Sequence, residues 1–214
     1  MTSWPRSAIV LVCAWATMAG AHAADTALDG YLEGLSTWSA SFTQSAVDAR
    51  GKSVAGSTGK LLIVRPGKFR WESTPDGASE TAQLMIADGR NLWFQDSDLN
   101  QVTVNPQAEA FSQSPAMLLA GGAELRGEFN VRDDGRRQGL DWVRVEPKDA
   151  ASEFREVRFG FKGKELARLV IVDKLGQSST LSFKDVKRNV KVDPALTEFV
   201  LPPGADLIGK PVAP

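Results

Sequence analysis

The sequence predicts an α+β protein in which a few short helices cover one large antiparallel sheet, within a single domain. Segments rich in strand-forming residues follow one another at short intervals, and turns with glycine, such as Pro66-Gly67 and Asp88-Gly89, separate them. Helical segments do not alternate with these strands, which argues against a parallel α/β sheet. A sheet of about eleven strands tends to curl. We therefore expect a partly closed barrel whose concave face is capped by the helices; a filled core of sheet and helices is the ordinary alternative.

The first 23 residues have the features of a cleaved secretory signal. Arg6 supplies a short positive start, the apolar stretch 8–19 is too short for a transmembrane helix, and Ala21-His22-Ala23 matches the small-x-small cleavage pattern. We therefore expect residues 24–214 to form one exported domain. The alternative is an uncleaved membrane anchor.

The chemistry open to the mature chain is narrow, because the only cysteine, Cys13, and the only histidine, His22, precede the cleavage site. Lipidation at Cys13 is not expected, since Val12 stands where a small residue is needed. Without cysteine or histidine, a disulfide, a thiolate nucleophile, a histidine base and a Cys/His zinc site are all excluded. No metal or other cofactor is expected. Removing Arg6 from the 25 basic residues leaves 24 against 26 acidic residues, so nothing indicates nucleic-acid binding.

The first element of the mature chain is a short amphipathic helix. Thr26 and Asp29 have the spacing of a capping box, and four apolar residues then recur at helical spacing: Leu28, Tyr31, Leu32 and Leu35. So short a helix buries little by itself and must lie on something else.

Strands follow this helix in two series. Hairpin turns between them make antiparallel pairing the natural outcome. The first series is expected at 37–48, 57–64, 68–74, 81–88, 91–96 and 101–105, and the second at 124–132, 140–147, 154–162, 167–173 and 178–185. Asp134-Gly135 is expected to be one of the turns, with the carboxylates of Asp133 and Asp134 solvated.

A second helix interrupts the strands within residues 106–122. Ser114 is placed to cap it, Pro115 to open its first turn, and Gly121-Gly122 to end it. The helix itself, residues 116–120, is apolar nearly all round, so it needs cover from the rest of the molecule.

Motifs for catalysis or nucleotide binding are incomplete. Ser57 and Lys60 match S-x-x-K, but its companion motifs are missing and the match lies on a strand. The GKS at 51–53 has alanine at position 46 where a phosphate loop has glycine, and the DSDLN at 96–100 is followed by Gln101 and Gln107 where a calcium loop has glycine and glutamate. The chain is not expected to be an enzyme; a serine/lysine esterase is the alternative in that class.

Six short motifs, in their order and spacing, resemble the LolA family of periplasmic outer-membrane lipoprotein carriers over essentially the whole mature chain. They are SFTQ at 41–44, GKL at 59–61 with RPGKFRW at 65–71, IADGRNLW at 86–93, PAMLL at 115–119, FKDVK at 183–187 and FVLPPGAD at 199–206.

The resemblance implies an unclosed antiparallel β-barrel with a helical lid over an apolar cavity. It further implies a periplasmic monomer that accepts acylated lipoproteins from an ATP-driven inner-membrane transporter and delivers them to an outer-membrane lipoprotein receptor, LolB. Other periplasmic half-barrels carry different acyl compounds or sense lipids, and these readings stay open because fold does not fix cargo.

The resemblance also assigns residues to roles. Arg65 takes the place of an arginine that hydrogen-bonds the lid helices and holds the empty carrier closed; from the residues alone it reads as a solvated turn residue. The lid is expected to comprise Leu28, Leu32 and Leu35 with Met117, Leu118 and Leu119. The cavity wall, or ligand-binding surface, is expected to include Phe69, Trp71, Trp93 and Val143, although aromatic residues at strand spacing often form plain core.

Overall fold

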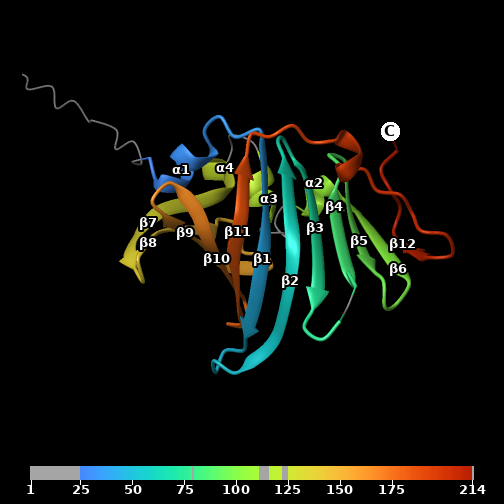
Figure 1. Cartoon of the computed structure of the whole chain (residues 1–214), viewed down its shortest axis with the longest axis horizontal. Helices are drawn as coiled ribbons and strands as arrows, with labels where there is room; N and C mark the ends of the chain where they lie inside the picture. Colours follow the sequence, from blue (N-terminus) through green and yellow to red (C-terminus); the bar gives the residue numbers. More distant parts are fainter. Residues whose placement is uncertain (1–24, 79, 111–115, 122–124, 214) are drawn as a thin grey trace, which may run out of the picture.

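A sheet of twelve strands forms the body of the protein in the computed structural model, which describes residues 25–78, 80–110, 116–121 and 125–213. The expected signal segment, Ser114, Pro115 and Gly122 lie outside these residues. The sheet is open, since β12 and β7 are its two edges, and its strand order is β12-β6-β5-β4-β3-β2-β1-β11-β10-β9-β8-β7. Figure 1 shows it curving around the helices. The predicted fold class, a single open antiparallel sheet with a few short helices, is confirmed.

Eleven of the strands pair antiparallel, as the hairpin turns predict, and only β12 runs parallel to its neighbour β6. The central strand β1 joins the two strand series, because it pairs with β2 on one side and with β11 on the other. The strands are β1 Thr37–Val47, β2 Ser53–Val64, β3 Lys68–Pro75, β4 Gln83–Ala87, β5 Asn91–Asp96, β6 Gln101–Pro106, β7 Phe129–Arg137, β8 Leu140–Pro147, β9 Phe154–Lys162, β10 Glu165–Asp173, β11 Ser178–Arg188 and β12 Asp206–Ile208.

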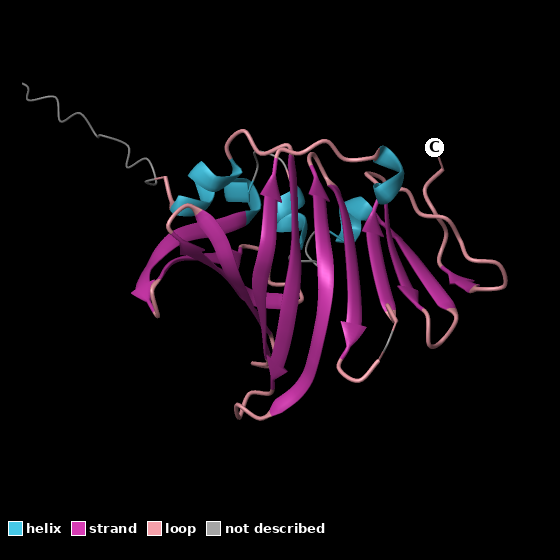
Figure 2. Ribbon diagram, viewed as in Figure 1, coloured by secondary structure: helices cyan, strands magenta, loops and turns pink. Residues whose placement is uncertain are grey.

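Within the described residues, four short α-helices lie on one side of this sheet (Figure 2). They are α1 Ala27–Leu32, α2 Gln107–Ala110, α3 Ala116–Ala120 and α4 Leu125–Glu128; a 3-10 helix, η1 Pro194–Thr197, follows the last long strand. No helix within the described part of the chain is long and apolar enough to cross a bilayer.

The core lies between the helices and the concave face of the sheet. Alternation along β1 buries Trp38, Ala40 and Phe42, and the paired strands β2 and β3 add further apolar residues to the same face. Gly59 is needed where the Phe42 ring crosses β2, because a β-carbon there would lie 2.5 Å from the ring. One continuous apolar cluster therefore joins strands and helices.

The segment expected as a strand at 124–132 differs in the structure. Its first part forms α4, and β7 begins only at Phe129 and continues to Arg137. A register shift between Asp133 and Arg136 absorbs Asp134-Gly135 into the strand, and the chain turns instead at Gln138-Gly139, both with positive φ. The predicted turn at Asp134-Gly135 is therefore wrong, and Asp134 is not a solvated turn residue.

The C-terminal segment after β11 crosses the sheet to η1 and ends beside β5 and β6 (Figure 1). It covers part of the outer face, where Ile86 and Val104 are buried on the side away from the helices. Neither η1 nor β12 is predicted from the sequence, because three or four residues are too few to show a period.

Candidate functional site

The helix α1 carries the first apolar residues of the candidate lid. The Asp29 carboxylate accepts hydrogen bonds from the Thr26 backbone N–H and hydroxyl, at 2.7 and 2.8 Å, which fixes the helix start. Leu28 and Tyr31 are buried in the core and Leu32 is partly buried. Leu35 is also buried but lies beyond the helix end.

The helix α3 carries the other apolar residues of the candidate lid. All five of its residues, including Met117, Leu118 and Leu119, are buried against the sheet. These side chains and those of α1 belong to the same cluster as the concave face, so in this closed arrangement the helices themselves fill the interior.

The turn at Arg65-Pro66-Gly67 makes hydrogen bonds to both helices, α1 and α3. The Arg65 guanidinium donates to the carbonyl of Leu32, the last residue of α1, at 2.9 Å and to the carbonyl of Gly121, which follows α3. Both acceptors lie at helix ends, where carbonyls lack intrahelical partners. The turn's backbone adds a third link, since the Gly67 N–H donates to the Ala120 carbonyl at 2.7 Å. The Arg65-Pro66 bond is cis.

Arg65 is partly buried in this position, and burial lowers the pKa of its guanidinium. Arginine nevertheless stays charged at neutral pH, since its pKa lies far above neutral pH. Arg65 also lines a hollow of about 530 Å³ beside α1, together with Leu32, Leu35, Pro66 and Leu125. The latch contacts expected from the resemblance are thus present; that they govern opening stays a prediction.

Gln107, at the start of α2, holds the same turn from the opposite side. Its side-chain amide donates to the Gly67 carbonyl at 2.7 Å, and its side-chain oxygen accepts from the Gly89 N–H at 2.9 Å. The Gly67 backbone is therefore held on one side by α3 and on the other by Gln107. In the sequence, Gln107 stands out only as a misfit in a calcium-loop pattern.

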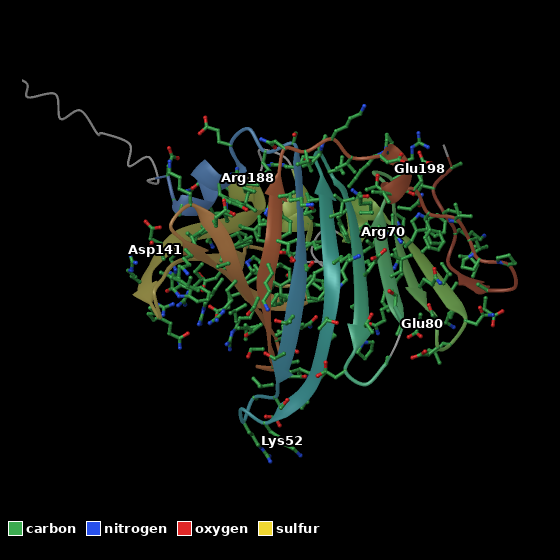
Figure 3. The ribbon with its side chains drawn as sticks, in the orientation of Figure 1. Lys52, Arg70, Glu80, Asp141, Arg188 and Glu198 are labelled. Carbon is green, nitrogen blue, oxygen red and sulfur yellow. The ribbon has the colours of Figure 1, made fainter. Side chains whose placement is uncertain are left out.

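Two further arginines hold α1 in place. Arg188, near α1 in Figure 3, donates to the Tyr31 carbonyl at 2.6 Å and lies over the Tyr31 ring, 4.2 Å from its centroid. Arg126 of α4 forms an ion pair of 2.6 Å with Asp29. Burial works to raise the pKa of Asp29, but hydrogen bonds from Arg126 and Thr26 outweigh it and hold the pKa below its usual value. No local sequence signal marks these partners, because they come from distant segments.

The residues expected on the cavity wall divide between the two faces of the sheet. Phe69 and Val143 are buried in the core cluster, and Trp71 packs against it with its ring 4.9 Å from that of Phe42. Trp93 instead pairs with Ile86 in the row that includes Arg70, on the outer face. There it stacks on Phe199, with ring centroids 4.7 Å apart, and donates to Asp88.

The prediction that Trp93 shares a wall with Trp71 is therefore wrong. Alternation shows which residues of one strand share a face, but the register across the turn at 89–90 decides how two strands align. Trp93 thus belongs to the surface on which the C-terminal segment packs.

The geometry offers no catalytic pair at the motif considered in the sequence. Ser57 and Lys60 are three residues apart on β2, so their side chains point to opposite faces. Among the described residues, no group of three or more Asp, Glu, His or Cys is placed to hold a metal ion. What the arrangement can do is bind: an apolar concave face is covered by short helices that are fastened mainly through their ends.

These features define a half-barrel with a helical lid. Residues 33–200 match the family described as Outer membrane lipoprotein carrier protein LolA. The chain belongs to the LolA family, which confirms the resemblance carried by the six motifs.

Relatives named outer-membrane lipoprotein carrier protein cover nearly the whole chain. The one from Dechloromonas aromatica is 36% identical over 183 residues, 86% of each protein. The one from Methylibium petroleiphilum is 37% identical over 205 residues, which is 94% of this chain and 97% of the relative.

Solved structures show the same fold at much lower identity. A LolA superfamily protein from Nitrosomonas europaea has a TM-score of 0.50 at 15% identity and covers 80% of this chain and 96% of that one. An uncharacterized conserved protein from Thermus thermophilus has a TM-score of 0.52 at 14% identity, with 85% and 96% covered. At such identity the likeness extends to the fold alone.

Proposed function

We propose that the protein is a periplasmic carrier that binds the acyl chains of lipoproteins released from the inner membrane and delivers them to the outer membrane. It receives its cargo from an ATP-driven transporter and passes it to an outer-membrane lipoprotein receptor such as LolB. The observation that carries this proposal is family membership over residues 33–200 together with near full-length relatives that bear the carrier name.

The physical task suits a lidded apolar face. Each methylene of an acyl chain costs about 0.8 kcal/mol in water, so a lipoprotein cannot cross an aqueous space without cover. A carrier must bury the chains and still release them. Helices that pack on the concave face in the empty state help release, because binding exchanges one apolar contact for another and keeps the net affinity low.

The fastening of the helices supports a lid that opens as a unit. Arg65 reaches Leu32 of α1 and Gly121 after α3, so one side chain spans both halves of the lid. A hydrogen bond to a charged group contributes about 1.5–3 kcal/mol, less where water reaches it. Such bonds are strong enough to favour closure and weak enough for acyl chains to displace, with no covalent step.

Cargo release from spheroplasts tests the proposal. Mature protein, residues 24–214, is added to spheroplasts that synthesise a triacylated lipoprotein, and lipoprotein in the soluble fraction is measured as a 1:1 complex. Wild type is expected to release the lipoprotein. Arg65→Leu is expected to accept cargo but to transfer it poorly to receptor-containing membranes, because the closed state that drives release is weakened.

Arg50→Leu serves as the matched control, since Arg50 is exposed in the β1–β2 turn. Lys52 of that turn lies at the far end of the sheet from Arg188 and α1 (Figure 3). Arg50→Leu should behave as wild type. No soluble complex with wild type would overturn the carrier role. Equal transfer by Arg65→Leu and wild type would leave the carrier role intact and overturn the latch.

A further inference from the structure

The outer face of the sheet carries a hollow of about 270 Å³ over β8 to β10, on the side opposite the helices. Its side is set by the register: Val143 and Phe159 pair in the core row, while Trp142 and Gly160 pair in the next row and face outward. The lining residues are Arg137, Gln138, Trp142, Arg158, Arg168, Val170 and Thr180. This hollow has no part in the proposed lipoprotein site.

The floor of the hollow is built around Trp142. A β-carbon at position 160 would lie 2.9 Å from the Trp142 ring, so Gly160 is what lets the indole lie across β9. The indole N–H donates to the Arg137 carbonyl at 3.1 Å, which fixes the ring orientation. With Val170 beside it, the tryptophan forms a small apolar floor.

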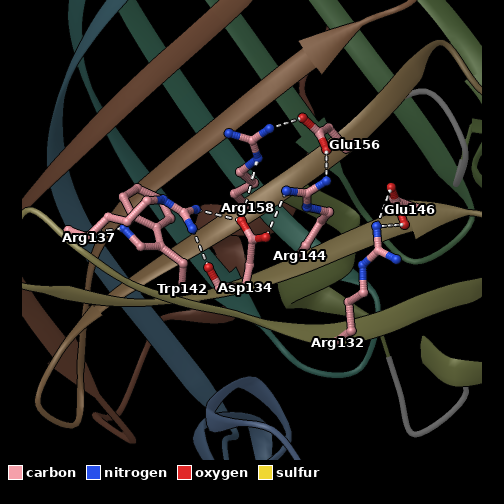
Figure 4. Close-up of polar contacts among 8 residues, drawn as sticks. All are labelled: Arg132, Asp134, Arg137, Trp142, Arg144, Glu146, Glu156 and Arg158. Carbon is pink, nitrogen blue, oxygen red and sulfur yellow. Dashed lines mark hydrogen bonds and ion pairs between the residues drawn. The ribbon is translucent and has the colours of Figure 1, made fainter.

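Arginines and two carboxylates form a network beside this floor (Figure 4). Asp134 accepts from Arg137 at 2.6 Å and from Arg144 at 2.7 Å. Glu156, almost fully buried, pairs with Arg158 at 2.5 Å and with Arg144 at 3.3 Å. Burial works to raise the pKa of Asp134, but the two arginines outweigh it and hold the pKa below its usual value, so this carboxylate is ionised at neutral pH.

The charges of the network do not balance. Three guanidinium groups share two carboxylates, and the fourth, that of Arg168, bonds the neutral side-chain oxygen of Gln138 at 3.3 Å. The described residues around the hollow thus leave an excess of two positive charges. The Nε of Arg158 is buried and makes no hydrogen bond among the described atoms; its ion-pair contact with the Asp134 carboxylate is long, at 3.9 Å. An anionic group bound in the hollow would offset this excess of positive charge.

We propose that this hollow binds the phosphate of an anionic phospholipid headgroup. The planar guanidinium group of arginine can donate two hydrogen bonds to two oxygens of one phosphate. A guanidinium group already held by its neighbours loses little conformational freedom on binding. The apolar floor of Trp142 and Val170 suits the glycerol carbons next to the phosphate, which a bare ion lacks. The site would let the protein rest on an anionic membrane surface by the face opposite the helices.

Vesicle binding by cargo-free mature protein tests this assignment. Co-sedimentation is measured with phosphatidylcholine vesicles with and without phosphatidylglycerol, at low and physiological ionic strength. Wild type is expected to bind only the phosphatidylglycerol vesicles. Arg168→Gln should bind about five- to tenfold more weakly, because one charge-assisted hydrogen bond is lost. Arg168→Lys keeps the charge but lacks the paired guanidinium donors, so its binding should lie between that of wild type and that of Arg168→Gln.

Arg155→Gln is the matched control, because Arg155 is exposed on β9 and does not line the hollow. It should bind as wild type does. Equal binding by Arg168→Gln and wild type, equal binding to both vesicle types, or no binding to either would overturn the assignment. Calorimetry with inorganic phosphate is the second arm: binding of phosphate that is lost in Arg168→Gln, without vesicle binding, would overturn the lipid headgroup in favour of a free-ion site. Neither arm uses a lipoprotein, so failure here is distinguishable from failure of the carrier role.

Discussion

Three arginine side chains help to hold α1 in place. A helix of six residues is unstable alone and leaves its last carbonyls unpaired. Arg65 and Arg188 bond the carbonyls of Leu32 and Tyr31, and Arg126 pairs with Asp29 at the other end. These three contacts come from three separate segments, so the position of α1 depends on how the fold places those segments.

The pair of Asp29 and Arg126 predicts a pH-dependent contribution to stability. The folded-state pKa of Asp29 is lowered, so its stabilisation is present above the unfolded value near ~3.9 and is lost as pH falls through the folded pKa. Asp29→Asn is expected to lower the free energy of unfolding by about 1 kcal/mol at pH 7, since the pair is partly exposed. The difference should shrink in acid, as urea unfolding at several pH values would measure.

Glu33→Gln is the control for this prediction, because Glu33 is exposed just after α1. It should cost little at either pH. A loss in Asp29→Asn that stays constant down to the lowest pH would show that packing or capping, and not the ionised carboxylate, stabilises the helix.

A hydrogen bond from Gln107 joins the helix α2 to the turn between β2 and β3. Gln107 bonds Gly67 and Gly89 through the two ends of its amide, and Gly67 bonds Ala120 of α3. Any movement of α3 away from the sheet must therefore break a bond to a turn that Gln107 holds still. For the opening proposed above, we expect α2 to stay in place while α1 and α3 move.

Gln107→Met is expected to loosen this connection, because it keeps the side-chain volume and removes both hydrogen bonds. We expect the free energy of unfolding to fall by about 1–3 kcal/mol, as for a buried donor and acceptor left unpaired. Amide hydrogen exchange should show faster exchange at Gly89, whose N–H bonds Gln107 directly. Gln177→Met, at an exposed turn position, should change neither quantity. Unchanged protection of Gly89 would contradict this role of Gln107.

The molecule as a whole is built in three layers: helices, sheet and C-terminal segment. The segment reaches back over the outer face, where Phe199 stacks on Trp93 and Val212 exchanges backbone hydrogen bonds with the Asn91 side chain. The two faces of the sheet thus differ in kind. One is covered by helices fastened at their ends, and the other is covered in part by a segment that also adds β12 to the sheet edge.

Phe199→Ala is expected to release the C-terminal segment without opening the lid. The loss of a stacked, partly buried ring should cost about 1–2 kcal/mol in chemical unfolding. Trp93 fluorescence should change, and the amides of β12 should exchange faster. Val200→Ala is the neighbouring control, since Val200 is 83% exposed and should cost almost nothing. Faster exchange in α1 or α3 would contradict the separation of the two layers.

Much of this architecture is readable from local sequence. The strands at residues 91–96, 140–147 and 154–162 have the predicted bounds, as does the apolar helix at 116–120. Alternation, helical spacing and turn glycines act between residues close in the chain, so a single sequence carries them. The open antiparallel class follows from the order of such elements. The six motifs add the family, and with it the predicted role of Arg65.

Only the folded chain decides how distant segments align. Which face of β5 joins the core, and hence the place of Trp93, depends on the register with β4. The bulge that draws Asp134 into β7 and toward Arg144, and the reach of Arg188 to Tyr31, depend on pairing between strands far apart in sequence. A local pattern can state that residues share a face, but the free energy that selects the partner of that face comes from burial and pairing across the whole sheet.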